Sequence, residues 1–142
     1  MNLIVWSAIQ TGHSLLHNAI GTGDDGVVNG VRRLLYEIVY NLCDNAIKYN
    51  NPGGSVKVIV TQKSGAVLLS VQDTGIGISP EHQDKVFERF YRVDKSHSKQ
   101  SGGTGLGLSI VKHAVQYHHG KITVESEVNR GTTISVLFDT RA

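Results

Sequence analysis

The stretch from Val31 to Tyr49, VRRLLYEIVYNLCDNAIKY, decides the fold of this 142-residue chain. Its apolar side chains recur at helical spacing, and the turn signal Asn51-Pro52-Gly53-Gly54 follows it, so we predict one long helix. The apolar stripe consists of Val31, Leu34, Leu35, Ile38, Val39, Leu42 and Ala46. A stripe of this width predicts that one face of the helix packs on a hydrophobic core.

After this helix, two pairs of segments alternate apolar and polar residues, and each pair flanks a turn signal. The first pair covers residues 56–60 and 67–71, with the turn at Lys63-Ser64-Gly65. The second covers residues 122–124 and 134–138, with the turn at Asn129-Arg130-Gly131. Each pair predicts an antiparallel hairpin with one buried side.

Further helices are predicted between and before the hairpins. Ser79-Pro80-Glu81 has the features of a helix start, and we expect a short helix from there to about Phe87. A second clear helix is expected from Gly107 to about His118, ended by Gly120. Residues 3–9 are expected to form a short amphipathic helix. Residues 21–30 are expected to form a glycine-rich, acidic connection.

Helices interleaved with hairpins predict an α+β fold. We expect a two-layer sandwich in which a mixed, mostly antiparallel sheet carries helices on one face. The length predicts a single domain over residues 1–142.

Composition excludes several classes of function. A net charge of +2 is too weak to indicate binding to nucleic acid or to a charged membrane surface. No apolar run is long enough to span a membrane, and the first residues lack the pattern of a signal peptide. The single cysteine, Cys43, allows no internal disulfide and is expected to pack as a small side chain in a cytoplasmic protein.

Four polar side chains lie along one edge of the long predicted helix, away from its apolar stripe. At about 100° per residue, all four fall within about 80° of one another. They are Glu37, Asn41, Asn45 and Lys48. Oxygens in this set could hold a hard cation and its nitrogens could meet phosphate, although a solvated helix flank has the same composition.

Two glycine-rich segments add to this edge. Asp73-Thr74-Gly75-Ile76-Gly77 directly follows a predicted strand, so its carboxylate could accept a hydrogen bond from an amino group, and a plain turn fits equally well. Residues 102–109 run into the second helix and could offer free amides to an anion. This segment fits neither the Walker pattern nor the dinucleotide-binding fingerprint.

Taken in order, these segments resemble the four conserved boxes of the catalytic ATP-binding domain of bacterial sensor histidine kinases. That superfamily also contains DNA gyrase, the heat-shock chaperone and the mismatch-repair ATPases. The boxes correspond to Glu37–Tyr49, Asp73–Ile78, the aromatic segment Phe87–Asp94 and Gly103–Leu108. The resemblance is strongest over residues 34–138 and loose over residues 1–30.

The resemblance implies a role for each matching residue. Asp73 would accept the adenine amino group, Gly77 would let the base lie close, and Thr133 would support the adenine pocket through water. Asn41 would ligate Mg²⁺ with help from Glu37, directly or through water, and these two are the implied catalytic residues. The implied ATP-binding set is Asn41, Asn45, Lys48, Tyr49, Asp73, Gly75, Ile76, Gly77, Tyr91, Arg92, Lys95, Lys99, Gly103, Thr104, Gly105, Leu106, Gly107, Leu108 and Thr133.

A mobile lid over ATP is also implied, from about residue 93 to residue 101. The family often has arginines in this lid, and this chain offers Lys95 and Lys99 in their place.

The implied reaction transfers the γ-phosphoryl group of Mg²⁺-ATP to a histidine on a separate helical dimerisation domain of the same parent protein. A response regulator would act downstream, and the parent would be a membrane-anchored sensor with this domain in the cytoplasm. His13 lacks the sequence context of a phosphoacceptor. Alternatives stay open: an ATP-hydrolysing conformational machine with Glu37 as base, and a non-catalytic regulator or anti-sigma-type serine kinase that would use the same pocket.

His118 and His119 close the second predicted helix. We interpret them as favourable partners of the partial negative charge at a helix end. A metal-binding pair is disfavoured because neighbouring side chains on a helix point about 100° apart.

Overall fold

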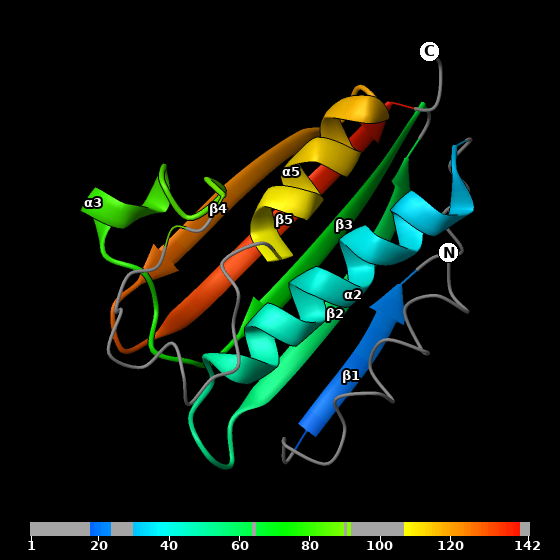
Figure 1. Cartoon of the computed structure of the whole chain (residues 1–142). Helices are drawn as coiled ribbons and strands as arrows, with labels where there is room; N and C mark the ends of the chain where they lie inside the picture. Colours follow the sequence, from blue (N-terminus) through cyan, green and yellow to red (C-terminus); the bar gives the residue numbers. More distant parts are fainter. Residues whose placement is uncertain (1–17, 24–29, 64, 90, 92–106, 140–142) are drawn as a thin grey trace.

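The structure is a computed structural model that describes residues 18–23, 30–63, 65–89, 91 and 107–139 (Figure 1). In this part of the chain, five strands form one sheet in the order β1-β2-β3-β5-β4. Helices α2 and α5 lie on one face of the sheet (Figure 1). The predicted α+β sandwich is therefore confirmed. The short helix predicted over residues 3–9 lies outside the described residues.

Both predicted hairpins are present. They consist of β2 (Ser55–Lys63) with β3 (Ala66–Asp73), and β4 (Lys121–Glu127) with β5 (Gly131–Asp139). Strand β5 also pairs antiparallel with β3, which joins the hairpins into one sheet.

Strand β1 (Asn18–Gly23) pairs parallel with β2 at the edge of the sheet. The prediction that a connection begins at Gly21 is therefore wrong, because residues 21–23 belong to this strand. Its sequence NAIGTG has no apolar alternation, so the strand depends on its pairing with β2.

Helix α2 (Arg32–Lys48) confirms the prediction from the apolar stripe. Helix α5 (Gly107–Tyr117) confirms the second one.

Helix α3 is shorter than predicted and covers only Pro80–Gln83. The backbone beyond it forms turns of four residues, in which the N–H groups of Lys85 and Glu88 donate to the carbonyls of His82 and Lys85. These turns pack Val86 and Phe87 against the core, so burial of their side chains takes precedence over continuation of the helix.

The core lies between the two helices and the sheet. Its buried side chains come from α2 and α5 and from alternate positions of β2, β3 and β5. Cys43 is part of it, as predicted, and burial raises the pKa of its thiol to about 12. The other face of the sheet carries no described helix, and among the described residues no helix has the length and apolar character needed to cross a membrane.

Helices α2 and α5 run antiparallel. The backbone N–H of Val31, just before α2, contacts His118, which directly follows α5. Halfway along α2, Asn41 faces Gly107, the first residue of α5. The start of α5 therefore lies beside the polar edge of α2 (Figure 1).

Candidate functional site

Asn41 connects the polar edge of α2 to the end of the last glycine-rich segment. Its Nδ2 donates to the carbonyl oxygen of Glu37 at 2.7 Å, so its Oδ1 is turned toward α5. A Cβ atom on Gly107 would lie only 3.3 Å from that oxygen. Glycine at this position therefore lets the backbone of α5 approach the Asn41 amide oxygen closely.

The two charged residues of this edge, Glu37 and Lys48, each pair with another residue of α2. Arg33 Nε lies 3.7 Å from Glu37 Oε1, and Lys48 Nζ lies 2.9 Å from Asp44 Oδ2. Asn45 is partly buried on the same side of the helix. The edge thus has both charges, with the amides of Asn41 and Asn45 between them.

Asp73 ends strand β3, and its carboxylate is held through one oxygen. Oδ1 accepts hydrogen bonds from the backbone N–H groups of Gly75 at 2.9 Å and Thr132 at 3.2 Å. No described residue donates a hydrogen bond to Oδ2. Burial raises the pKa of this carboxyl group, and the two backbone donors act in the opposite direction. Oδ2 is therefore an acceptor with a fixed position.

The loop after Asp73 is tied to α2 and to the turn between β4 and β5. Ile76 N donates to the Tyr49 carbonyl oxygen at 3.1 Å, and the Ile76 carbonyl accepts from Asn129 N at 2.8 Å. Gly77 has φ +74°, and a Cβ atom there would lie 2.2 Å from the Glu127 carbonyl oxygen. Close packing against this turn therefore requires glycine at position 77.

Tyr49 and Gly75 join the Asp73 loop to the end of α2. A Cβ atom on Gly75 would lie 2.2 Å from the Tyr49 carbonyl oxygen. From residue 49 back to residue 41, α2 covers about 12 Å at 1.5 Å per residue. The Asp73 loop thus lies at the C-terminal end of the polar edge of α2. The Asn41–Gly107 contact lies further back along the same edge, toward the N-terminus of α2.

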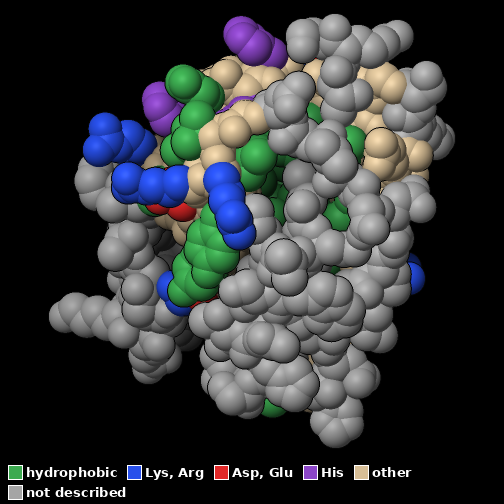
Figure 2. Space-filling view, turned by 90° about the vertical axis from the view of Figure 1, so that its right-hand side faces the viewer, with side chains coloured by type: hydrophobic (Ala, Val, Ile, Leu, Met, Phe, Trp, Pro, Cys, Tyr) green, Lys and Arg blue, Asp and Glu red, His purple; other side chains and the backbone are tan. Residues whose placement is uncertain are grey.

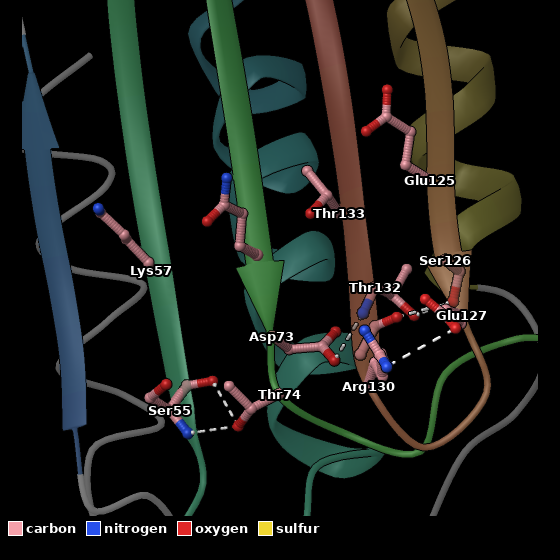
Figure 3. Close-up of a pocket in the computed structure, with 12 residues that line it drawn as sticks. Ser55, Lys57, Asp73, Thr74, Glu125, Ser126, Glu127, Arg130, Thr132 and Thr133 are labelled. Carbon is pink, nitrogen blue, oxygen red and sulfur yellow. Dashed lines mark hydrogen bonds and ion pairs between the residues drawn. The ribbon is translucent and has the colours of Figure 1, made fainter.

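Threonine 133 does not join this arrangement, whereas Thr132 does. Thr133 pairs with Gln72 and Glu125, on the sheet face opposite α2 and α5. Thr132 is buried beside Asp73, and its hydroxyl lies 2.8 Å from Ser126 Oγ (Figure 3). The buried alternation Ile134, Val136, Phe138 extends back to residue 132, and this signal could have identified Thr132 from the sequence.

Ser126 was not predicted as a site residue. It connects the loop that follows Asp73 to the start of β5. Its Oγ accepts from Ile78 N at 2.7 Å and donates to the Gly131 carbonyl oxygen at 2.9 Å. Gln83 reinforces the same contact by donating to the Ile78 and Ser126 carbonyls. The loop that follows Asp73 is therefore fixed against β4.

A polar hollow of about 490 Å³ opens on the other face of the sheet (Figure 3). Its lining includes both signs of charge, from Lys57, Arg130, Glu125 and Glu127. Asp73 is also among its lining residues, whereas Asn41 and Gly107 are not. The hollow is therefore distinct from the space beside the polar edge of α2.

The remaining predicted site residues divide into two groups. Leu108 is buried in the core, and the Tyr91 hydroxyl hydrogen-bonds His82 Nδ1. The second group, together with the predicted lid, lies outside the described residues: Arg92, Lys95, Lys99, Gly103, Thr104, Gly105 and Leu106.

Comparison with known proteins agrees with this geometry. The family model for the histidine kinase-, DNA gyrase B-, and HSP90-like ATPase matches residues 30–142. The sensor histidine kinase RppB of Synechocystis is 45% identical over 102 residues, which is 72% of this chain and 22% of RppB. The histidine-protein kinase ArlS of Staphylococcus aureus is 47% identical over 95 residues, 67% of this chain and 21% of ArlS.

Solved structures show the same fold. The mycobacterial sensor histidine kinase MprB superposes with a TM-score of 0.84 at 31% identity, covering 98% of this chain and 93% of that one. The catalytic domain of the histidine kinase ThkA has a TM-score of 0.81 at 24% identity, covering 99% of this chain and 92% of that one.

The chain spans about a fifth of the length of RppB and ArlS. It belongs to the family of histidine kinase-, DNA gyrase B- and HSP90-like ATPases, as a homologue of the catalytic ATP-binding domains of sensor histidine kinases.

Proposed function

We propose that this domain binds Mg²⁺-ATP along the polar edge of α2 and passes the γ-phosphoryl group to a histidine on a separate helical dimerisation domain of its parent protein. The observation that carries the proposal is the contact between Asn41 Oδ1 and the start of α5. This contact brings the amide oxygen of Asn41 close to the backbone at Gly107, on the same helix whose end holds the Asp73 loop.

Asp73 would bind the adenine base. Its Oδ1 is occupied by two backbone donors, so Oδ2 is the oxygen that would accept a hydrogen bond from the adenine amino group. Guanine has a carbonyl oxygen at the corresponding position, which would face the carboxylate unfavourably. The loop residues Ile76 and Gly77 would lie beside the base, whereas Thr133, on the opposite face of the sheet, would not reach it.

The phosphates would lie toward Asn41 and Gly107. An amide oxygen is a hard ligand of the kind that Mg²⁺ prefers, and the Asn41 amide nitrogen is already engaged by the Glu37 carbonyl. Asn41, with Glu37 in support, would therefore hold Mg²⁺, whose charge would offset that of the phosphates. Asn45, Lys48 and Tyr49 would flank the nucleotide along the same edge.

The rest of the phosphate site is proposed from the family resemblance. Lys95, Lys99 and Arg92 would contribute positive charge. The segment Gly103–Leu108 would contribute backbone amides that surround the triphosphate.

Phosphoryl transfer requires mainly positioning and charge compensation from the protein. The acceptor histidine nitrogen would attack the γ-phosphorus, the bond to the β–γ bridging oxygen would break, and ADP would leave. The acceptor histidine would lie in the parent protein, which would be anchored in a membrane with this domain in the cytoplasm. A response regulator would act downstream. The histidine kinase ShkA, 25% identical over 98% of this chain and matched over 29% of its own, has been solved with AMPPNP, which supports nucleotide binding.

The test is to mix the domain with Mg²⁺-ATP and a separately produced helical phosphoacceptor domain. We expect acid-labile, alkali-stable phosphate on the acceptor and little ATP turnover by this domain alone. Steady hydrolysis without a partner would favour an ATP-driven conformational machine. Acid-stable phosphate on a serine of an added partner would favour a serine kinase.

A further inference from the structure

Helix α2 begins without a capping side chain of its own. The residue at its N-cap is Val31, and no acidic residue lies in its first turn. Two arginines, Arg32 and Arg33, occupy that turn instead, where positive charge is unfavourable because of the helix dipole. The backbone N–H groups at this helix start therefore need an acceptor from elsewhere.

His118 supplies that acceptor from the end of α5. The Val31 N–H donates to His118 Nε2 at 3.0 Å, and His118 Nδ1 lies 2.7 Å from the Ala114 carbonyl oxygen. Because a backbone N–H can only donate and a carbonyl can only accept, Nε2 has no proton and Nδ1 has one. The ring thus bridges two helix ends with its proton on Nδ1, and the bond to the Ala114 carbonyl agrees with the predicted interaction with the partial negative charge at a helix end.

The surroundings hold the His118 ring in place. A Cβ atom on Gly30 would lie 2.2 Å from Nε2, so only glycine at position 30 lets the ring dock against the backbone. On the other side, the ring meets Phe138 edge-on, with centroids 6.3 Å apart. Figure 2 faces the side where α2 begins and shows histidine side chains at the top, at the height of the end of α5 in Figure 1.

We infer that His118 is a positioning residue of the nucleotide site: it fastens the end of α5 to the start of α2 and so sets the axial register that brings Gly107 against Asn41. The two helices cover about 15 Å from Val31 to Asn41 and about 17 Å from Gly107 to His118. Because these two helix segments have nearly equal lengths, joining them at Val31 and His118 keeps Asn41 and Gly107 side by side at the other end. The link to the nucleotide rests on the proposed function.

The first test examines the bridge without nucleotide. An N–H···N hydrogen bond transmits a scalar coupling between its two nitrogens, so NMR of the ¹⁵N-labelled domain should detect coupling between Val31 N and His118 Nε2. The nitrogen shifts of His118 should report a proton on Nδ1 alone. Absence of the coupling, or a proton on Nε2 at neutral pH, would overturn the inference.

The second test follows the effect at the far end of the helices. His118→Phe keeps a ring but removes both hydrogen bonds, and His118→Gln keeps an acceptor and a donor. In His118→Phe the Asn41 side-chain amide and the Gly107 backbone amide should shift, and His118→Gln should restore part of the change. His113→Ala, at an exposed position of the same helix, is the matched control and should leave both signals in place.

Nucleotide binding separates positioning from a general loss of stability. His118→Phe should raise the Kd for Mg²⁺-ATP about three- to tenfold, the loss expected for hydrogen bonds of ordinary strength. The Kd for adenosine, which would contact only the Asp73 end, should stay within about twofold. Equal losses for both ligands, or unchanged Asn41 and Gly107 signals, would contradict positioning.

Gly30→Ala provides an independent perturbation if His118→Phe does not fold, because it displaces the ring without removing it. Its effect and that of His118→Gln should not add in the double variant, since both act through the same bridge. Additive effects would refute that shared action. If the wild-type domain binds no ATP, the proposed function fails, whereas the coupling and the Asn41 and Gly107 signals still decide the role of His118.

Discussion

Replacing Asp73 with asparagine changes a single functional group in the proposed adenine site. Oδ1 of Asp73 accepts from the backbone N–H groups of Gly75 and Thr132. In the Asp73→Asn variant the amide oxygen should stay with these two donors, because a nitrogen there would face them with its own hydrogens. The NH₂ group then takes the place of Oδ2 and presents a donor to the adenine amino group.

The expected loss follows from this exchange. A hydrogen bond to a charged acceptor contributes about 1.5–3 kcal/mol, so the Kd for ATP should rise about ten- to hundredfold. The Kd for GTP should not rise, because the new NH₂ group can donate to the guanine carbonyl oxygen. The variant should therefore reverse part of the selectivity between the two bases.

Titration calorimetry with ATP and GTP measures both constants. Asp84→Asn is the matched control, because it removes the same charge at an exposed position after α3 and should leave both constants unchanged. If Asp73→Asn binds ATP as tightly as the wild type does, Asp73 is not the adenine acceptor. If ATP and GTP affinities fall together, the variant has disturbed the loop and not base recognition.

Four further predictions test other parts of the domain. Asn41→Ala should abolish the dependence of ATP affinity on Mg²⁺ while keeping the preference for ATP over GTP; calorimetry with and without the ion measures this, and unchanged metal dependence would contradict the assigned ligand. Ser126→Ala leaves the N–H of Ile78 without its partner at 2.7 Å, so chemical denaturation should show a loss of about 1–3 kcal/mol, and undiminished stability would argue against the role of this hydroxyl. His119 has φ 56° at the C-terminal cap of α5, so His119→Gly should raise the free energy of unfolding by about 1 kcal/mol; a decrease would show that the imidazole itself is needed. The raised pKa of Asp73 means that the folded state binds its proton more tightly than the unfolded state does, so this group lowers stability as the pH rises from the ordinary value of 3.8 through the raised one. Asp73→Asn should therefore melt above the wild type at neutral pH, with the difference shrinking as the pH falls toward that value, and a difference independent of pH would contradict the assigned direction.

Local patterns predicted most of the fold. Helices α2 and α5 follow from apolar side chains spaced at the helical period, and both hairpins follow from alternation around turn residues. The position of Asp73 at a strand end follows from the same alternation. These features depend on residues close to one another in the chain, so the sequence is sufficient to find them.

Three features needed more than local pattern. Strand β1 has no alternation and exists through parallel pairing with β2, far along the chain. Helix α3 ends early because Val86 and Phe87 reach the core through turns. The contact of Thr132 with Asp73 depends on the register between β3 and β5, because alternation indicates only which face of β5 carries Thr132.

The sequence by itself determined which residue types are available for nucleotide chemistry and on which elements they lie. Only the tertiary structure decided how they meet: Asn41 with Gly107, Asp73 with Thr132, and Val31 with His118. The physical reason is that each contact joins segments separated by more than 50 residues, 87 in the last case. Periodicity reports how a segment presents its own faces, whereas packing of helices on a common sheet determines which faces touch.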